Sequence, residues 1–366
     1  MRKSENNQTF LALIRLGIGH DVKALPESID WEAMRAVANE QSLTAILLDG
    51  VLALSRQGAL TGGRSLDIAY KMQWINSVAL NYERRYEDYR KQIGELAGFY
   101  NAHGLKLMIL KGYGLSLNYP QPKHRPCGDI DTWAFGRYKE VDKLLSEKLS
   151  IPVDSTLHHH TVYQFGDFTI ENHYDFVNVH YGHRNAELEQ IFKELATDDS
   201  FWTEIDGQRV YLPSPNLHAL FLLRHTMFHF SSTQMTIRQL LDWGFFIEKN
   251  ATAIDWDWFE SVLTEFHMKD FFACVNAICV EDLGFDATLF PPTSVDADLK
   301  KRVLDDTFSP EFYESPPPHN KLLKRVFFKY RRWKSNGWKH DFCYGGNRLK
   351  AFFISAWSHI LKPASI

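Results

Sequence analysis

The spacing of hydrophobic and polar positions changes twice along the chain, and each change predicts a change in secondary structure. Up to about residue 103, apolar residues recur every three or four positions, which predicts helices. Asp30 is expected to cap a helical run from Trp31 to Leu54, because aspartate favours N-caps and Glu32 follows in the first turn. A long charged helix is expected over 76–103, ended by Gly104.

The middle of the chain has the pattern of mixed strands and helices. Gly166-Asp167 separates two alternating runs and is a two-residue turn typical of a β-hairpin. Prolines 120, 122 and 126 predict a loop. The predicted elements are a strand over 105–110, a short helix reaching Asn118, a strand over 129–135, a helix over 137–149 and hairpin strands over 161–165 and 168–174.

Helical spacing returns after Pro215. Helices are expected over 216–230, 236–249 and 256–283, and the prolines of 314–318 should break the chain again. We therefore expect an α+β fold, in which a small mixed-sheet domain lies between N-terminal and C-terminal helical regions. The predicted segments are 1–103 (helical), 104–212 (α+β), 213–310 (helical) and 311–366 (basic and aromatic).

Composition and charge exclude several classes of protein. Apolar residues make up 45% and charged residues 23% of 366, which argues against a disordered chain. No run approaches 18 apolar residues, so no membrane span is expected, and the absence of a targeting signal predicts a cytoplasmic location. The four cysteines are scattered, which disfavours a disulfide scaffold or a structural zinc site.

Two aspartates in the middle segment are the main candidates for chemistry. Asp129 and Asp131 are separated by one residue on a predicted strand, so both carboxylates should project from one face. Two neighbouring negative charges favour a cation between them, and oxygen ligands favour Mg²⁺, or Mn²⁺, with substrate phosphates. Lys111-Gly112 follows the preceding strand as a backbone turn that phosphates could approach.

These motifs together resemble a known family. A strand, Lys111-Gly112, a helix, a proline loop and Arg125-x-x-Gly128-Asp129-Ile130-Asp131 are similar to the uncharacterised nucleotidyltransferases of the polymerase-β superfold. The resemblance includes Glu171-x-His173 and the helical stretches His225–His229 and Arg238–Asp242, and it spans residues 100 to 245. Lys111 stands where better-known members carry a small residue, and Thr132-Trp133 replaces apolar residues.

The resemblance implies a magnesium-dependent enzyme that transfers a nucleoside monophosphate from a nucleoside triphosphate and releases pyrophosphate. The acceptor would be a hydroxyl or amine of a small molecule, a protein or an RNA. Asp129, Asp131 and a third acid would hold the metal. The expected nucleotide-binding residues are Lys111, Gly112, Arg125, Gly128, His160, His173 and Arg238, although Arg238 could equally pair with Asp242.

Glu171, Asp167 and Asp175 compete for the place of the third carboxylate. With Gly166-Asp167 as the turn, the register puts His160 opposite His173 and Glu171 in mid-strand on the polar face. Glu171 is therefore the predicted third ligand, with the two histidines beside the phosphates.

Three alternatives remain open. The protein could be a catalytically silent nucleotide-binding or antitoxin-like protein that keeps the fold. A histidine metal hydrolase is the lesser alternative, because no HExxH or His/Cys spacing is present. The segment from Lys321 to the end carries 11 Lys/Arg against one acid and suits RNA or an anionic surface, but we favour a helix that packs its aromatics inward.

Overall fold

The computed structural model describes residues 2–22, 24–179, 183–292, 294–314 and 322–345. The described residues up to His218 form one compact unit, and those from Ala219 onwards form a second. The division falls within one helix, α9 (Pro215–Ser232). The four-part division drawn from the sequence stays a prediction.

The N-terminal helices of the first unit confirm the predicted helical region. Asp30 caps α2 as expected, since its Oδ1 accepts a hydrogen bond from the backbone N–H of Ala33 at 3.0 Å. The predicted run from Trp31 to Leu54 is two helices, because Ser42 adopts a φ of 57° between them. These helices are α1 (Arg2–Gly17), α2 (Trp31–Glu40), α3 (Thr44–Arg56), α4 (Ile68–Val78) and α5 (Arg84–Ala102).

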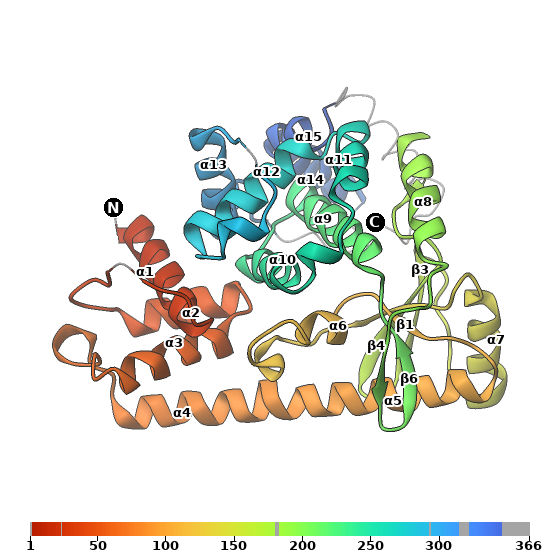
Figure 1. The fold of residues 1–366 in the computed structure, drawn as a ribbon, viewed down its shortest axis with the longest axis horizontal. Coiled ribbons are helices and arrows are strands. Elements are labelled where there is room, and N and C mark those ends of the chain that lie inside the picture. The colour runs from red at the N-terminus through yellow and green to blue at the C-terminus, as the bar shows by residue number, and fades with distance from the viewer. Residues whose placement is uncertain (1, 23, 180–182, 293, 315–321, 346–366) are drawn as a thin grey trace. The chain divides into compact units, whose positions relative to one another are not determined.

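The long helix predicted over 76–103 begins earlier than expected. Helices α4 and α5 are joined by a π-helical segment, Ala79–Glu83, and continue as one rod in Figure 1. The rod therefore starts at Ile68, where Asp67 accepts a hydrogen bond from the N–H of Tyr70. It ends as predicted, next to Gly104 with a φ of 67°.

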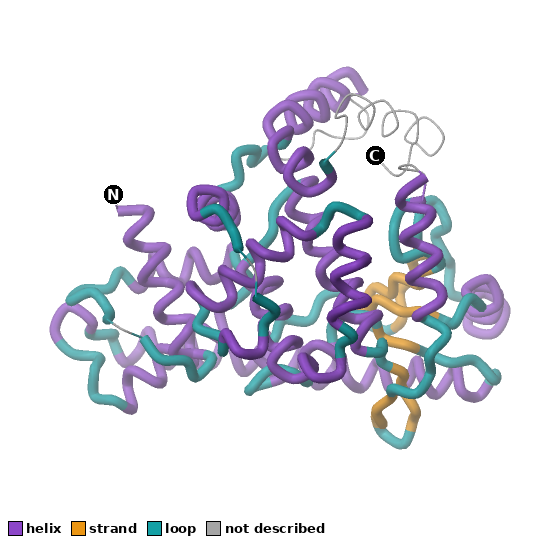
Figure 2. Tube along the Cα trace, turned by 45° about the horizontal axis from the view of Figure 1, so that its top comes forward, coloured by secondary structure: helices purple, strands orange, loops and turns teal. Residues whose placement is uncertain are grey.

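A six-stranded mixed sheet confirms the α+β fold class, and Figure 2 shows its strands close together in space. Strand β1 pairs in parallel with β6, and β2 pairs in parallel with β4; the other pairs are antiparallel. The strand order is β3-β4-β2-β1-β6-β5. The strands are β1 (Met108–Ile109), β2 (Ile130–Trp133), β3 (His160–Phe165), β4 (Phe168–His173), β5 (Trp202–Ile205) and β6 (Gln208–Tyr211).

The predicted hairpin register is confirmed, one strand is shorter than predicted, and one hairpin was not predicted. His160 pairs with His173 and Phe165 with Phe168, as the Gly166-Asp167 turn requires. The strand expected over 129–135 covers Ile130–Trp133, so Asp129 lies directly before it. The β5–β6 hairpin was not predicted, although its turn is the favoured Asp-Gly pair at 206–207.

One face of the sheet is apolar and packs on α5 and α7 (Tyr138–Leu149). Ile130 and Ile170 are fully buried in this core, together with Val141 of α7. Because side chains alternate along a strand, the residues next to these isoleucines point to the opposite face. The first unit also contains the one-turn helix α6 (Tyr113–Ser116) and the longer helix α8 (His183–Leu195).

The second unit is helical in its described residues. His267, with a φ of 57°, breaks the helix that was predicted over 256–283. In the basic segment, Phe328 is buried against Phe312 while Phe327 is 62% exposed, so only part of the expected inward packing is present. The helices after α9 are α10 (Ile237–Asn250), α11 (Trp256–Glu265), α12 (Lys269–Ala277), α13 (Ala297–Phe308), α14 (Leu322–Ser335) and α15 (Gly337–Tyr344).

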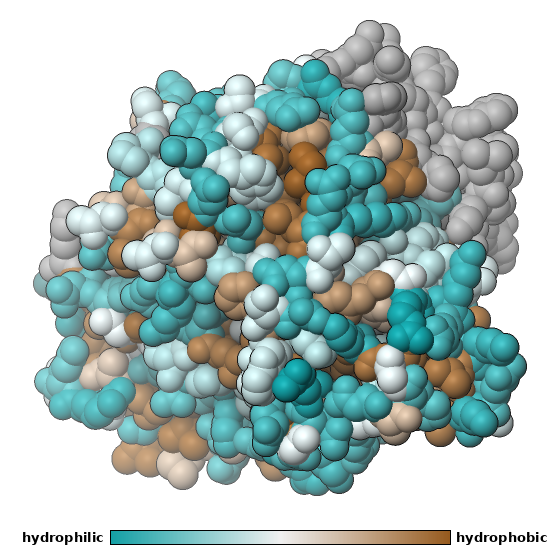
Figure 3. Space-filling view, turned by 45° about the vertical axis from the view of Figure 1, so that its right-hand side comes forward, coloured by the Kyte–Doolittle hydropathy of each residue, from teal (hydrophilic) through white to brown (hydrophobic). Residues whose placement is uncertain are grey.

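Among the described residues, no helix combines the length and the apolar character needed to cross a membrane. Figure 3 shows hydrophilic residues over much of the face that it presents, with smaller hydrophobic areas between them. The predicted break at 315–318 and the end of the basic segment, 346–366, lie outside the described residues.

Candidate functional site

Three carboxylates meet on the sheet face opposite the apolar core. Asp131 of β2 lies in register with Glu171 of the parallel strand β4, so both side chains project from the same face. Asp129 comes two residues before Asp131. Burial raises the pKa of Asp129, and the charges of Glu171 and Asp131 raise it further. The three acids are therefore close enough to repel one another, which is the condition that favours a bound cation.

Lys111 is the cation nearest to these acids. Its Nζ lies 2.7 Å from Asp131 Oδ1, and both side chains are largely buried. Burial by itself raises the pKa of Asp131, but the charges of Lys111 and His173 outweigh it and hold that pKa well below its usual range. Asp131 is therefore ionised at neutral pH, in the form that can bind a metal.

His173 connects Asp131 to Glu171. Its Nε2 lies 3.2 Å from Asp131 Oδ1 and 3.7 Å from Glu171 Oε2. Its Nδ1 donates a hydrogen bond to the backbone carbonyl of Asp175 at 3.2 Å, because a carbonyl oxygen only accepts. Burial lowers the pKa of His173, but the hydrogen bonds to Asp131 and Glu171 outweigh it and raise the pKa to about 9.

His160 faces Glu171 from the neighbouring strand. The His160 Nε2 atom is 3.7 Å from Glu171 Oε1, and the side chain is buried. Burial, and then the charge of His173, lower the pKa of His160 to about 4, so this imidazole is neutral at pH 7. The ring of His159 contacts that of His160, and burial lowers the pKa of His159 to about 2. Glu171 is thus flanked by a neutral imidazole, His160, near its Oε1 and by a protonated one, His173, near its Oε2.

The Lys111-Gly112 turn is fixed by helix α5. Gly112 has a φ of 60°, and a Cβ there would lie 2.1 Å from the Tyr89 hydroxyl oxygen. The same hydroxyl donates a hydrogen bond to the backbone carbonyl of Asp129 at 3.2 Å. One side chain therefore holds the turn and the start of β2, and only glycine fits where they meet.

Arg125 ties the proline loop to the same turn. The side chain is buried, with 4% exposed, and its Nη1 donates hydrogen bonds to the carbonyl oxygens of Gly112 and Pro126. These contacts show a loop-ordering role that the sequence did not predict. Its expected contact with phosphate stays a prediction.

The order of these motifs along the chain agrees with one family. The family model described as uncharacterised nucleotidyltransferase matches residues 27–284, which is more than half of the 366 residues. The chain belongs to this nucleotidyltransferase family. The match begins in the N-terminal helices and ends after α12, so it extends on both sides beyond the residues that carried the resemblance.

Other comparisons add little to this nucleotidyltransferase assignment. A similar solved structure is the "crystal structure of an antigenic nucleotidyltransferase-like protein from Paracoccidioides brasiliensis". It is 17% identical with a TM-score of 0.31, and the alignment covers 43% of this chain and 75% of that chain. The comparison with curated proteins gives no match.

The structure of this nucleotidyltransferase brings six of the predicted residues together. Gly128 lies beside them with an open space where a Cβ would stand. Arg238 belongs to the second unit, where its Nη1 lies 3.5 Å from Asp242 Oδ2, so the expected ion pair is present. The six residues are Lys111, Asp129, Asp131, His160, Glu171 and His173.

Sequence reasoning missed a buried histidine next to Arg125. His124 Nδ1 lies 2.6 Å from Asp49 Oδ2 in α3, and its Nε2 lies 3.1 Å from Glu83 Oε1 in the π-helical segment. The partners are 75 and 41 residues away in sequence, so no local spacing could have indicated them. This contact joins the N-terminal helices to the loop that precedes the carboxylates.

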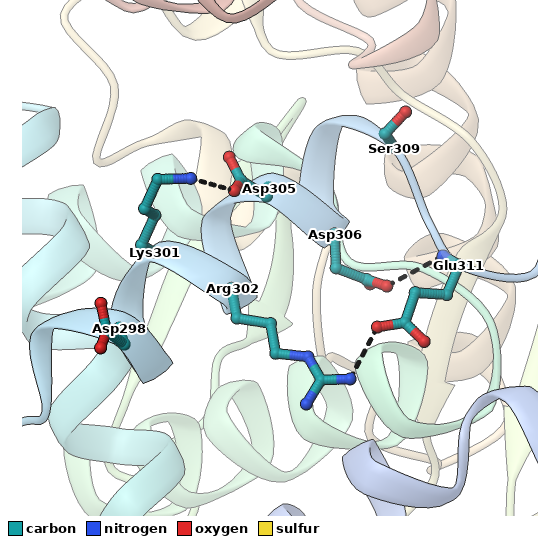
Figure 4. A pocket seen from close by; sticks show the side chains of 7 residues that line it. All are labelled: Asp298, Lys301, Arg302, Asp305, Asp306, Ser309 and Glu311. Atoms are coloured by element: carbon teal, nitrogen blue, oxygen red, sulfur yellow. Dashed lines mark hydrogen bonds and ion pairs between the residues drawn. The ribbon is translucent and has the colours of Figure 1, made fainter.

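The second unit contains two further polar features. His225 and His229 of α9 lie with their Nε2 atoms 3.0 Å apart. A surface pocket on α13 is lined by acids and cations that pair with each other, as Figure 4 shows for Lys301 with Asp305 and Arg302 with Glu311. Because both cations of this lining already pair with acids, neither is a clear candidate for binding an anion.

Proposed function

We propose that this family member transfers a nucleoside monophosphate from a nucleoside triphosphate to a hydroxyl or amine acceptor. The oxygen or nitrogen of the acceptor attacks the α-phosphorus and loses its proton. The bond from that phosphorus to the bridging oxygen breaks, and pyrophosphate leaves. The observation that carries the proposal is the register of Asp131 with Glu171, which puts two carboxylates side by side with Asp129 next to them.

The three carboxylates form a donor set that suits Mg²⁺ or Mn²⁺. Hard oxygen ligands from two or three acids, completed by substrate phosphates, are typical of such sites. The nearby positive charge is unevenly distributed: the Lys111 ammonium group and the His173 imidazolium both lie against Asp131, whereas the pKa of Asp129 is raised by burial and by the charges of Glu171 and Asp131. When bound, the ion would stabilise negative charge on the phosphates during transfer.

The chain's own residues would position the triphosphate. Lys111 is the cation closest to the acids, and its place on a turn before α6 allows its ammonium group to exchange Asp131 for a phosphate. The Gly112 backbone, held by Tyr89 and Arg125, would keep that turn in one conformation. Gly128, exposed and without a side chain, would let a nucleotide approach the start of β2.

Binding and turnover need separate tests, because a missing acceptor would imitate an inactive enzyme. Each of the four triphosphates is titrated into the full chain with and without Mg²⁺, and pyrophosphate release is then measured with small-molecule, protein and RNA acceptors. We expect Mg²⁺-dependent binding that Asp129→Asn abolishes, whereas Glu204→Gln, which changes an exposed acid of β5, keeps it. Equal binding by Asp129→Asn, Asp131→Asn and the wild type would show that the metal assignment is wrong.

The same experiment distinguishes the silent alternative. A nucleotide-binding protein without activity would bind the Mg²⁺-triphosphate and release no pyrophosphate with any acceptor. All three acids are present and two are aligned in register, which supports an active enzyme.

A further inference from the structure

Two histidines and Glu171 form a compact group within the candidate site. His160 of β3 lies opposite His173 of β4, and Glu171 is on the same face two residues before His173. One nitrogen of each histidine and one carboxylate oxygen of Glu171 all lie within 4.8 Å of one another. The group is assembled by strand pairing and does not depend on any loop.

His160 has the character of a ligand without its ion. The side chain is 6% exposed, and neither Nδ1 nor Nε2 has a hydrogen-bond partner among the described residues. Most buried polar atoms in folded proteins have a hydrogen-bond partner, so an unpaired one usually indicates a bound ion or water. Its Nε2 lies 3.7 Å from Glu171 Oε1.

His173 is oriented for the same purpose. Its Nδ1–H is bound to the carbonyl oxygen of Asp175, which directs Nε2 toward Glu171 and Asp131. Histidines that bind metals commonly donate their second nitrogen to a backbone carbonyl or a carboxylate, which fixes the ring.

We propose that His160, His173 and Glu171 bind one divalent transition-metal ion of the Zn²⁺ class. Ligand atoms about 2.1 Å from a shared tetrahedral ion lie about 3.4 Å apart. Each histidine Nε2 is 3.7 Å from a Glu171 oxygen, His160 from Oε1 and His173 from Oε2. One ligand atom from each of the three residues lies within 4.8 Å of the others, so the side chains would move closer together to complete the site. Imidazole nitrogens distinguish such an ion from Mg²⁺, which prefers oxygen ligands.

This site goes beyond the proposed nucleotidyl transfer, because two of its three ligands are histidines, which are not among the carboxylates proposed to hold Mg²⁺. Three protein ligands leave a position open, which is typical of catalytic and not of structural metal sites. Glu171 would be shared, since Oε1 faces His160 and Oε2 faces His173 while Asp131 lies beside it in register. The hairpin register predicted from the sequence already put His160 opposite His173 with Glu171 on the same face, although no linear metal motif marks these three residues.

The test uses metal alone, without nucleotide. Full-length protein freed of metal is titrated with Co²⁺, followed by its visible absorption, and Zn²⁺ is then added as a competitor. We expect one bound equivalent that Zn²⁺ displaces and that excess Mg²⁺ leaves in place. His160→Gln, which keeps much of the side-chain volume, should weaken Co²⁺ binding at least tenfold, and His173→Ala should do the same.

Two control variants make the result specific. His229→Ala removes one member of a close histidine pair in the second unit, and should leave the Co²⁺ spectrum unchanged. Asp129→Asn should lose Mg²⁺-triphosphate binding and keep Co²⁺, so that failure of the two proposals can be distinguished. Unchanged Co²⁺ affinity in a folded His160→Gln variant would overturn the proposal. Displacement of Co²⁺ by Mg²⁺ as readily as by Zn²⁺ would overturn it as well. If His160→Gln does not fold, Glu171→Gln replaces it, with the same outcomes.

Discussion

Lys111 and Asp131 form an ion pair of 2.7 Å between the turn after β1 and the middle of β2. Asp131 also accepts a hydrogen bond from His173, so one carboxylate oxygen meets two cationic groups in the absence of metal. Lys111 therefore has two possible partners during function, the carboxylate and a phosphate. This predicts opposite effects of its removal on metal and on nucleotide.

Lys111→Gln should bind Mg²⁺ alone more tightly than the wild type, because a cation that competes for Asp131 is lost. The same variant should bind Mg²⁺-triphosphate about tenfold to a hundredfold more weakly, since a charged hydrogen bond contributes about 1.5–3 kcal/mol. Calorimetric titrations with each ligand would check both signs. Lys123→Gln, which removes an exposed lysine paired with Glu87, serves as the control. A decrease in both affinities would contradict the proposed exchange of partners.

Glu171→Gln should lower turnover by about a hundredfold or more while leaving the fold intact, because it removes a ligand charge and keeps the side-chain shape. Asp167→Asn is the matched control, since Asp167 lies exposed in the turn of the same hairpin. Asp175, the other competing acid, is paired with Lys193 at 2.6 Å. Pyrophosphate release and thermal unfolding would be measured for all variants. Full activity of Glu171→Gln would remove it from the site.

His124 should make the first unit more stable at low pH. Burial lowers the pKa of His124, but the hydrogen bonds to Asp49 and Glu83 outweigh it, so the folded pKa lies above the usual value of about 6.5. Because the folded pKa is raised, the stabilisation is fully present below about pH 6.5 and is lost as the pH rises through the folded value.

Urea unfolding at pH 6 and pH 9 would test this dependence. At pH 6, His124→Gln should be about 1.5–3 kcal/mol less stable than the wild type, because the charged hydrogen bonds to both acids are lost. At pH 9 the two proteins should differ much less. His20→Gln, which changes a histidine of the N-terminal helical region, is the control. A difference that is the same at both pH values would mean that His124 only fills space.

Gly112→Ala should be much more destabilising than Gly136→Ala. Both glycines have a positive φ, 60° and 81°, but Gly112 also has a ψ of −108°, which lies outside the left-handed helical region where a side chain costs about 1–2 kcal/mol. Only at Gly112 would the new Cβ collide with another group, the Tyr89 hydroxyl, while at Gly136 nothing lies within 4 Å. Thermal unfolding of both variants gives the comparison. Adding Tyr89→Phe should recover part of the loss at Gly112, and equal losses at the two glycines would contradict the clash.

The sequence by itself determined the local elements and one strand pairing. Apolar spacing predicted the helices on both sides of the sheet, and the Gly166-Asp167 turn set the hairpin register that brings His160 opposite His173. These predictions hold because helix periodicity and turn geometry depend on residues that are close in sequence. The resemblance to the family was also visible in the sequence, from the order of Lys111-Gly112, Asp129-x-Asp131 and Glu171.

Tertiary structure decided which of these residues meet. The sequence did not reveal that Asp131 lies in register with Glu171, because parallel pairing joins strands that are 40 residues apart and leaves no local signal. The same is true of Tyr89 against Gly112 and of His124 between Asp49 and Glu83. Periodicity fixes the face on which a side chain lies, whereas its neighbours on that face depend on how distant strands and helices pack together.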